Sequence, residues 1–107
     1  MEKATFGLDE NVASALTYVL GWLTGIIFLL MEKENKTVKF HAMQSTITFL
    51  GLTIVIIVLG WIPFIGMIVL LIDLIAVILW IVLIIKAYQG EKFKLPVIGD
   101  LAEAQVK

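Results

Sequence analysis

The chain has 107 residues, of which 61% are apolar and 16% are charged, and its formal net charge is −1. About half of the residues of a soluble domain are apolar, so this composition excludes an ordinary soluble protein and indicates one small integral membrane protein. The chain contains no cysteine, which excludes disulfides, thiolate metal sites and thiol nucleophiles. Every basic side chain is a lysine. Because the chain has no arginine to bind phosphates through two parallel hydrogen bonds, nucleic-acid binding is not expected.

Three apolar runs of about twenty residues, each long enough to cross a bilayer, follow one another along the chain. They predict helices at about 12–31, 42–60 and 66–86, followed by a tail at 87–107. The first run is not a cleavable signal, because no basic patch precedes it and no A-x-A site follows it. The predicted fold is therefore all-α and a single membrane domain: a bundle of three transmembrane helices with a short interfacial tail on the cytoplasmic side.

The two connections between these runs differ in polarity. The first, EKENKTVKFH, is charged, whereas the second, WIPFIG, carries no charge. The second should be a tight hairpin at the membrane surface, because Pro63 and Gly66 break the helix and aromatic side chains favour the interface.

The lysines predict the orientation of the chain in the cell membrane. With three crossings, one side of this multi-pass protein carries seven lysines and the other carries only Lys3. By the positive-inside rule, the N-terminus should lie outside and the C-terminus in the cytoplasm.

A single carboxylate, Asp73, interrupts the third apolar run. An ionised Asp at the centre of a membrane helix costs on the order of 2.5–3.5 kcal/mol, so its presence needs a reason. At a rise of about 1.5 Å per residue, Asp73 lies roughly 10 Å below the outer end of its helix. The same arithmetic places Thr17, Tyr18 and Thr53 of the other two helices at that depth. We therefore expect these hydroxyls to face Asp73 inside the bundle.

Three roles for Asp73 remain open on this basis. It could be a protonated carboxyl that bonds to Tyr18 or Thr53 and contributes to helix packing. It could belong to a proton or ion pathway, or it could contact a neighbouring subunit or partner.

The tail after the third helix cannot span the bilayer, because it is short, charged and broken by glycine. We expect Gly90 to end the third helix as its C′ residue. The tail should then fold back against the cytoplasmic end of the second helix, near His41 and Gln44. A functional site should lie in this cluster or in the layer of Asp73.

Two stretches, VKFHAMQS at 38–45 and KAYQGEKFKLPVIGDLAE at 86–103, together with ALTYVLGWLTG, resemble the Tic20-like family of small prokaryotic membrane proteins, also labelled DUF4870. The most specific elements of the resemblance are His41, Gln44, Ala87, Gly90, Pro96 and Gly99. Plastid members of that family belong to the inner-envelope protein import machinery. The resemblance therefore implies a subunit or accessory of a membrane complex, related to protein translocation.

The sequence favours a protein that acts by interaction within the bilayer, as a homo-oligomer or with other membrane proteins. The alternative is an oligomeric ion or proton channel or transporter that uses Asp73, because three helices alone enclose no pore. An enzyme is not expected, since His41 lies about 20 Å from Asp73 by helical rise and no nucleophile and base can meet. No cofactor is expected, and one histidine without cysteine makes a poor metal site.

Overall fold

A computed structural model of the protein describes residues 5–106. The described part of the chain is all-helical, which confirms the predicted class. It comprises a short 3-10 helix, η1 (Thr5–Gly7), and the α-helices α1 (Glu10–Val19), α2 (Trp22–Met31), α3 (Lys36–Gly60), α4 (Gly66–Tyr88) and α5 (Ile98–Val106).

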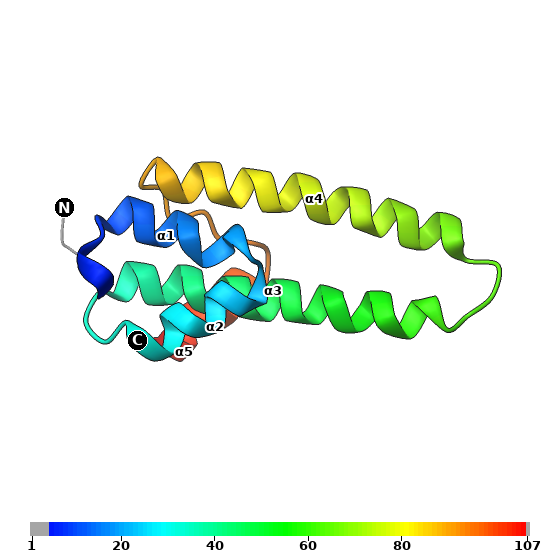
Figure 1. Ribbon diagram of the computed structural model, residues 1–107, viewed down its shortest axis with the longest axis horizontal. Helices are drawn as coiled ribbons and strands as arrows, with labels where there is room; N and C mark the ends of the chain where they lie inside the picture. The colour runs from blue at the N-terminus through cyan, green and yellow to red at the C-terminus, as the bar shows by residue number, and fades with distance from the viewer. Residues whose placement is uncertain (1–4, 107) are drawn as a thin grey trace.

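The two longest helices, α3 and α4, lie antiparallel and run the length of the molecule (Figure 1). They have 25 and 23 residues and are both long and apolar enough to cross a membrane. By helical rise they measure roughly 37 and 34 Å, against a hydrocarbon layer of about 30 Å. The ranges predicted as helices, 42–60 and 66–86, lie within α3 and α4. The loop between them is short, and Trp61 and Phe64 within it are exposed.

Helix α3 begins six residues before the predicted run because its first turn is capped. Asn35 is the N-cap, and its side-chain oxygen accepts a hydrogen bond from the backbone N–H of Val38 at 3.1 Å. The Glu32 carboxylate in turn accepts from the backbone N–H groups of Glu34 and Asn35. These bonds satisfy donors that a helix start leaves open, so the helix extends into the charged residues before Ala42.

The single helix predicted at 12–31 is not formed. The segment is two helices of ten residues each, α1 and α2, separated at Leu20 and Gly21. Gly21 has φ 62° and ψ −131°, a conformation that glycine adopts at no steric cost. The Thr24 hydroxyl accepts a hydrogen bond from the Leu20 N–H and donates to the Thr17 carbonyl, so it satisfies backbone groups that the break leaves open. Each helix measures roughly 15 Å, too short to cross a bilayer.

Helix α1 runs along the α3–α4 pair, and α2 returns beside it to the same end of the molecule (Figure 1). The start of α1 therefore lies beside the end of α4, where the Asn11 side-chain amide donates a hydrogen bond to the Tyr88 carbonyl at 2.9 Å. Three crossings would have placed these two positions at opposite ends. The difference follows from the break at Gly21. Lys3 and Lys107, which entered the orientation argument, lie outside the described residues.

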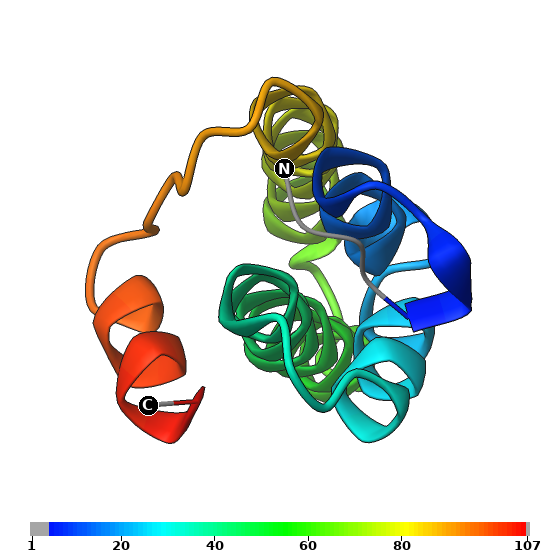
Figure 2. The same cartoon turned by 90° about the vertical axis from the view of Figure 1, so that its left-hand side faces the viewer.

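The chain beyond α4 folds back along the bundle, as predicted. Gly90, with φ 84°, is the C′ residue of α4, and its N–H bonds to the Ala87 carbonyl while the Glu91 N–H bonds to the Lys86 carbonyl. This is the Schellman arrangement expected of a C′ glycine. Residues 91–97, which we call the strap, lead to α5. Figure 2 shows α5 on one side of α3 and the α1–α2 pair on the other.

The packed core occupies only one half of the length of α3 and α4. Its buried hydrophobic members within the described chain include Ala13, Phe28, Val38, Phe40, Leu83, Ala87, Leu95 and Ala102, and none belongs to residues 50–78. Those residues, the apolar half, comprise the end of α3, the loop and the start of α4, and Figure 1 shows no other helix beside them. The rest of the molecule is the polar half.

Candidate functional site

A buried hydrogen-bonded cluster of three side chains lies at the centre of the polar half. Tyr18 comes from α1, and His41 and Gln44 come from α3. The Tyr18 hydroxyl lies 2.8 Å from His41 Nδ1 and accepts a hydrogen bond from Gln44 Nε2 at 3.0 Å. All three side chains are at least 98% buried. Burial at this level makes each bond costly to lose, since water cannot replace the missing partner.

The strap completes the cluster and fixes the orientation of the Gln44 amide. Gln44 Oε1 accepts from the backbone N–H of Leu95 at 2.9 Å, and Nε2 donates to the Phe93 carbonyl at 2.9 Å. A backbone N–H can only donate, so the orientation of the amide is set. The amide then donates to the Tyr18 oxygen, and the same hydroxyl makes a second hydrogen bond with His41 Nδ1.

Two further bonds connect the cluster to the break between α1 and α2. Trp80 Nε1 on α4 donates to the Tyr18 carbonyl at 2.6 Å, and the Ser45 hydroxyl on α3 donates to the Gly21 carbonyl at 2.9 Å. The two carbonyls flank the break, and each also accepts a backbone hydrogen bond, from the Gly21 N–H and the Gly25 N–H respectively. The cluster thus joins α1, α3, α4 and the strap. The predicted meeting of the tail with His41 and Gln44 is confirmed.

The hydroxyls predicted to surround Asp73 bond elsewhere. Thr17 is buried and donates to the Ser14 carbonyl of its own helix. Thr53 donates to the Phe49 carbonyl of its own helix. Tyr18 belongs to the His41 cluster. The prediction that these groups shelter Asp73 is wrong. For Thr17 and Tyr18 the error comes from treating 12–31 as one straight helix, whereas Thr53 bonds within its own helix.

Asp73 lies in the apolar half with an exposed side chain. No hydrogen bond or ion pair reaches it from the described chain. Asp73 lies seven residues, or two helical turns, before Trp80 on α4, so the two residues share one face of the helix. Near Trp80 this face packs against α1. Helix α1 ends before it reaches the level of Asp73. Asp73 therefore borders the space beyond the tip of the α1–α2 pair, where no segment of the described chain covers it.

Pro96 and Gly99 form the turn from the strap into α5. The Pro96 carbonyl accepts from the Ile98 N–H at 2.6 Å, and the Leu95 carbonyl accepts from the Gly99 N–H at 2.8 Å. A Cβ on Gly99 would lie 2.5 Å from Lys94 Cβ and 3.1 Å from Gln44 Oε1. Only glycine permits this approach of α5 to the cluster.

A charged cluster on α5 was not predicted from the sequence. Glu103 lies 2.9 Å from Lys94 Nζ and 3.2 Å from Lys92 Nζ, and the Lys92 ammonium lies 4.8 Å from the centre of the Phe40 ring. The hydrogen bond from Lys94, followed by that from Lys92, lowers the pKa of Glu103, and the bond to Glu103 raises the pKa of Lys94. These contacts hold α5 against the strap and α3. A signal was present in the alternation of lysines with apolar residues at 92–95.

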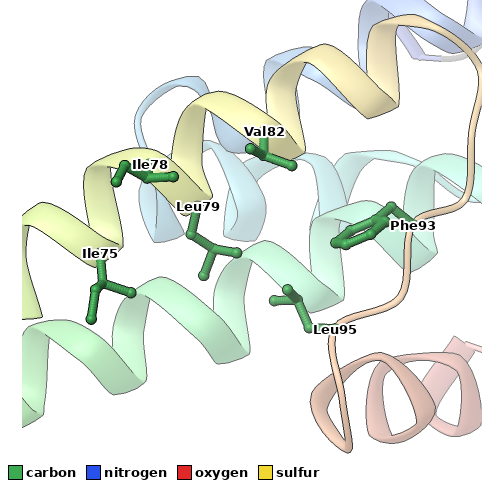
Figure 3. Close-up of a pocket in the computed structure, with 6 residues that line it drawn as sticks. All are labelled: Ile75, Ile78, Leu79, Val82, Phe93 and Leu95. Carbon is green, nitrogen blue, oxygen red and sulfur yellow. The ribbon is translucent and has the colours of Figure 1, made fainter.

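An apolar pocket of about 250 Å³ lies between α4 and the strap. Figure 3 shows that its walls are side chains of α4 on one side and of the strap on the other. Among the described residues, no group of three or more His, Cys, Asp or Glu side chains could hold a metal ion.

The geometry defines a class of protein: a small all-helical membrane protein with one long apolar hairpin, whose polar half is packed and whose apolar half is bare. Comparison with known proteins agrees with this class. The family model of the magnetosome magnetite crystal formation protein family matches residues 8–102, and the chain belongs to that family.

Archaeal relatives match nearly the whole chain. A UPF0132 membrane protein of Methanocaldococcus jannaschii is 57% identical over 103 residues, covering 96% of this chain and 94% of the relative. A UPF0132 membrane protein of Archaeoglobus fulgidus is 58% identical over 100 residues, covering 92% and 97%. No solved structure matches the chain significantly.

These findings correct the resemblance to the Tic20-like family. The matched family and relatives span the stretches on which that resemblance rested, and neither is Tic20-like or DUF4870. His41, Gln44, Gly90 and Gly99 serve the attachment of the strap to α3. Short patterns of glycine, proline and polar residues of this kind meet a local packing need and are weak evidence of one family. The translocation role implied by the resemblance loses its support.

Proposed function

We propose that this protein is a membrane-embedded scaffold that acts by binding other transmembrane helices, in the first place a second copy of itself. The observation that carries the proposal is the exposed Asp73 carboxyl in a span that is otherwise apolar. The proposed role is interaction and not catalysis. The family is described by magnetite crystal formation. The scaffold role proposed for this chain rests instead on its docking face, which offers one carboxylate among apolar side chains.

The proposed placement in the bilayer follows from the lengths of α3 and α4. The part of α3 from Ala42 to Gly60 spans roughly 27 Å, close to the hydrocarbon thickness of about 30 Å. The polar half then lies at the cytoplasmic side, where the lysines satisfy the positive-inside rule. The tip of the α1–α2 pair, level with Ser45 and Phe49, dips roughly 5–10 Å into the hydrocarbon layer. Exposed Leu23, Ile27 and Leu30 on α2 suit contact with lipid.

In this placement Asp73 lies roughly 10 Å from the outer end of α4, too deep for its short side chain to reach water. If the ionised Asp73 carboxylate faced lipid, its free energy of insertion would be unfavourable by about 2.5–3.5 kcal/mol. A polar partner from another chain removes much of that cost. In a two-fold dimer whose axis follows the membrane normal, Asp73 faces Asp73 of the partner subunit, and the two carboxyls can share a proton.

The neighbours of Asp73 suit close packing of helices. Ala76 lies on the same face of α4 one turn away, and a small residue there lets a second helix approach. The space beyond the α1–α2 tip is bordered by both α3 and α4. A helix from a second copy would extend the packing of the polar half into the apolar half.

Cysteine cross-linking tests this proposal directly, because the chain is naturally free of thiols. Val77→Cys adds a thiol one turn from Asp73 on the same side of α4, and Ile78→Cys adds one at the same depth that points about 100° away from Val77. Both side chains are exposed, at 50% and 62%. The proposal predicts disulfide-linked dimers with Val77→Cys and at least several-fold less with Ile78→Cys.

The same experiment with Asp73→Leu added to Val77→Cys asks whether the carboxyl drives association. Cross-linking should fall several-fold, and Asp73→Asn should retain part of it because an amide still bonds across the interface. Equal cross-linking at positions 77 and 78, or none at either, would overturn the proposed dimer face.

A second candidate function, proton or ion conduction between protomers, is favoured by the same exposed carboxyl. The measurement is flux into proteoliposomes. Asp73→Asn should abolish the flux if Asp73 titrates within the pathway. A wild-type protein without flux, or a flux that survives the substitution, excludes conduction through this carboxyl and leaves the scaffold proposal standing.

A further inference from the structure

The pocket between α4 and the strap is lined only by apolar side chains. Figure 3 shows α4 and the strap facing each other across it. The lining residues are Ile75, Ile78, Leu79, Val82, Phe93 and Leu95. No other segment of the described chain fills this space. A volume of about 250 Å³ accommodates part of a hydrocarbon chain.

The strap presents alternate side chains to opposite sides, as an extended segment does. Phe93 and Leu95 line the pocket, whereas Lys92 and Lys94 bond to Glu103 on α5. The main chain is held by Gln44, which bonds to the Phe93 carbonyl and the Leu95 N–H. The apolar wall is therefore fixed in place by the buried cluster.

The lining residues of α4 form one stripe along the helix, and this stripe continues to the side chain of Lys86. Ile75, Leu79 and Val82 follow the i, i+4, i+7 spacing, and Lys86 extends the stripe by one more turn. The Lys86 ammonium lies 3.2 Å from Glu91, and both side chains are well exposed, at 38% and 55%. A solvent-exposed pair of this kind is weak and can be displaced by a competing anion.

The bilayer placement proposed above puts this cation at the height of lipid phosphates. Lys86 lies roughly 6 Å beyond Val82 toward the cytoplasmic side, whereas Ile75 lies roughly 10 Å deeper than Val82. An apolar groove that begins in the hydrocarbon layer and ends at an interfacial lysine matches the layout of a phospholipid. Lysines at this height attract anionic headgroups.

We propose that the groove binds one anionic phospholipid, with its acyl chain along Ile75–Val82 beneath the strap and its phosphate at Lys86. This inference rests on the membrane placement of the proposed function but not on the dimer at Asp73. The lipid lies against the face of α4 opposite Asp73. The phospholipid and the second copy of the chain can therefore bind at the same time.

The test is native mass spectrometry of the purified protein after incubation with equal amounts of phosphatidylglycerol and phosphatidylcholine in mixed micelles. The wild type should retain one lipid, with phosphatidylglycerol favoured at least several-fold. Ile75→Trp fills the groove and should lower retention at least fivefold. Ile81→Trp, the same change at an exposed α4 position outside the pocket, should leave retention unchanged.

Lys86→Gln tests the contact with the headgroup separately from the contact with the acyl chain. It should remove most of the preference for phosphatidylglycerol while a lipid of either kind is still retained. No retained lipid in the wild type, equal retention by Ile75→Trp, or an unchanged preference with Lys86→Gln would overturn the proposal. Cross-linking of Val77→Cys in the Ile75→Trp background should stay at its original level, so a failure of the lipid site is distinguished from a failure of the dimer.

Discussion

Gln44 and Leu95, 51 residues apart in the chain, are joined by a hydrogen bond of 2.9 Å from the Leu95 N–H to the Gln44 side-chain oxygen. This bond fixes the orientation of the amide, which also donates to the Tyr18 hydroxyl beside His41. One glutamine on α3 thus determines how α1 and the strap pack on the long hairpin.

Gln44→Leu removes three hydrogen bonds at once and leaves the buried Leu95 N–H and the partly buried Phe93 carbonyl without this partner. Leaving buried groups unpaired costs about 1–3 kcal/mol each where they cannot reach water. We expect a loss of roughly 2–4 kcal/mol in the stability of the polar half, measured by thermal unfolding in detergent, and faster proteolysis of the strap. Gln105→Leu, at an exposed glutamine on α5, is the matched control and should change neither.

Gly25 marks the close crossing of α2 over α3. A Cβ there would lie 2.8 Å from Thr46 Oγ1 and 3.0 Å from the Ala42 carbonyl. Gly25→Ala should therefore destabilise the protein by about 1–3 kcal/mol, because α2 must shift outward. Gly51→Ala, on α3 where a Cβ meets nothing within 4 Å, should be neutral or slightly stabilising. Similar melting temperatures for the two variants would refute the described contact of α2 with α3.

The contact of α5 with the strap should weaken in acid. Lys94 and Lys92 lower the pKa of Glu103, so ionised Glu103 stabilises the folded arrangement at pH values above its ordinary pKa. That contribution is lost as the pH falls through the lowered pKa of the folded state. Hydrogen exchange of α5 amides should therefore speed up in acid relative to α3 amides, after correction for intrinsic rates. Glu103→Gln should exchange faster at neutral pH and lose most of the dependence, and an identical profile for both proteins would contradict this role.

The long apolar helices could be predicted from the sequence because bilayer thickness sets their length, and no tertiary contact competes with that requirement. The attachment of the tail to His41 and Gln44 could be predicted as well, since a glycine after α4 and an amphipathic tail leave few alternatives. Both predictions rest on local constraints.

The break at Gly21 could not be predicted, because a glycine inside an apolar run is usually tolerated in a membrane helix. What decides the outcome is a set of long-range bonds, from Ser45 to the Gly21 carbonyl and from Trp80 to the Tyr18 carbonyl. The wrong placement of Thr17 and Tyr18 beside Asp73 follows from this error. Once α1 turns back, Tyr18 meets His41, and Asp73 is left beyond the reach of α1.

The path of the first apolar run is the central claim, and site-specific labelling of single cysteines in sealed vesicles tests it most directly. Lys3→Cys, Phe64→Cys and Lys107→Cys mark the two ends of the chain and the α3–α4 loop in a protein without other thiols. With α1 and α2 returning to one side, a membrane-impermeant reagent should label positions 3 and 107 from the same side and position 64 from the other. Labelling of positions 3 and 107 from opposite sides would show that 12–31 crosses the membrane and would contradict the structure described here.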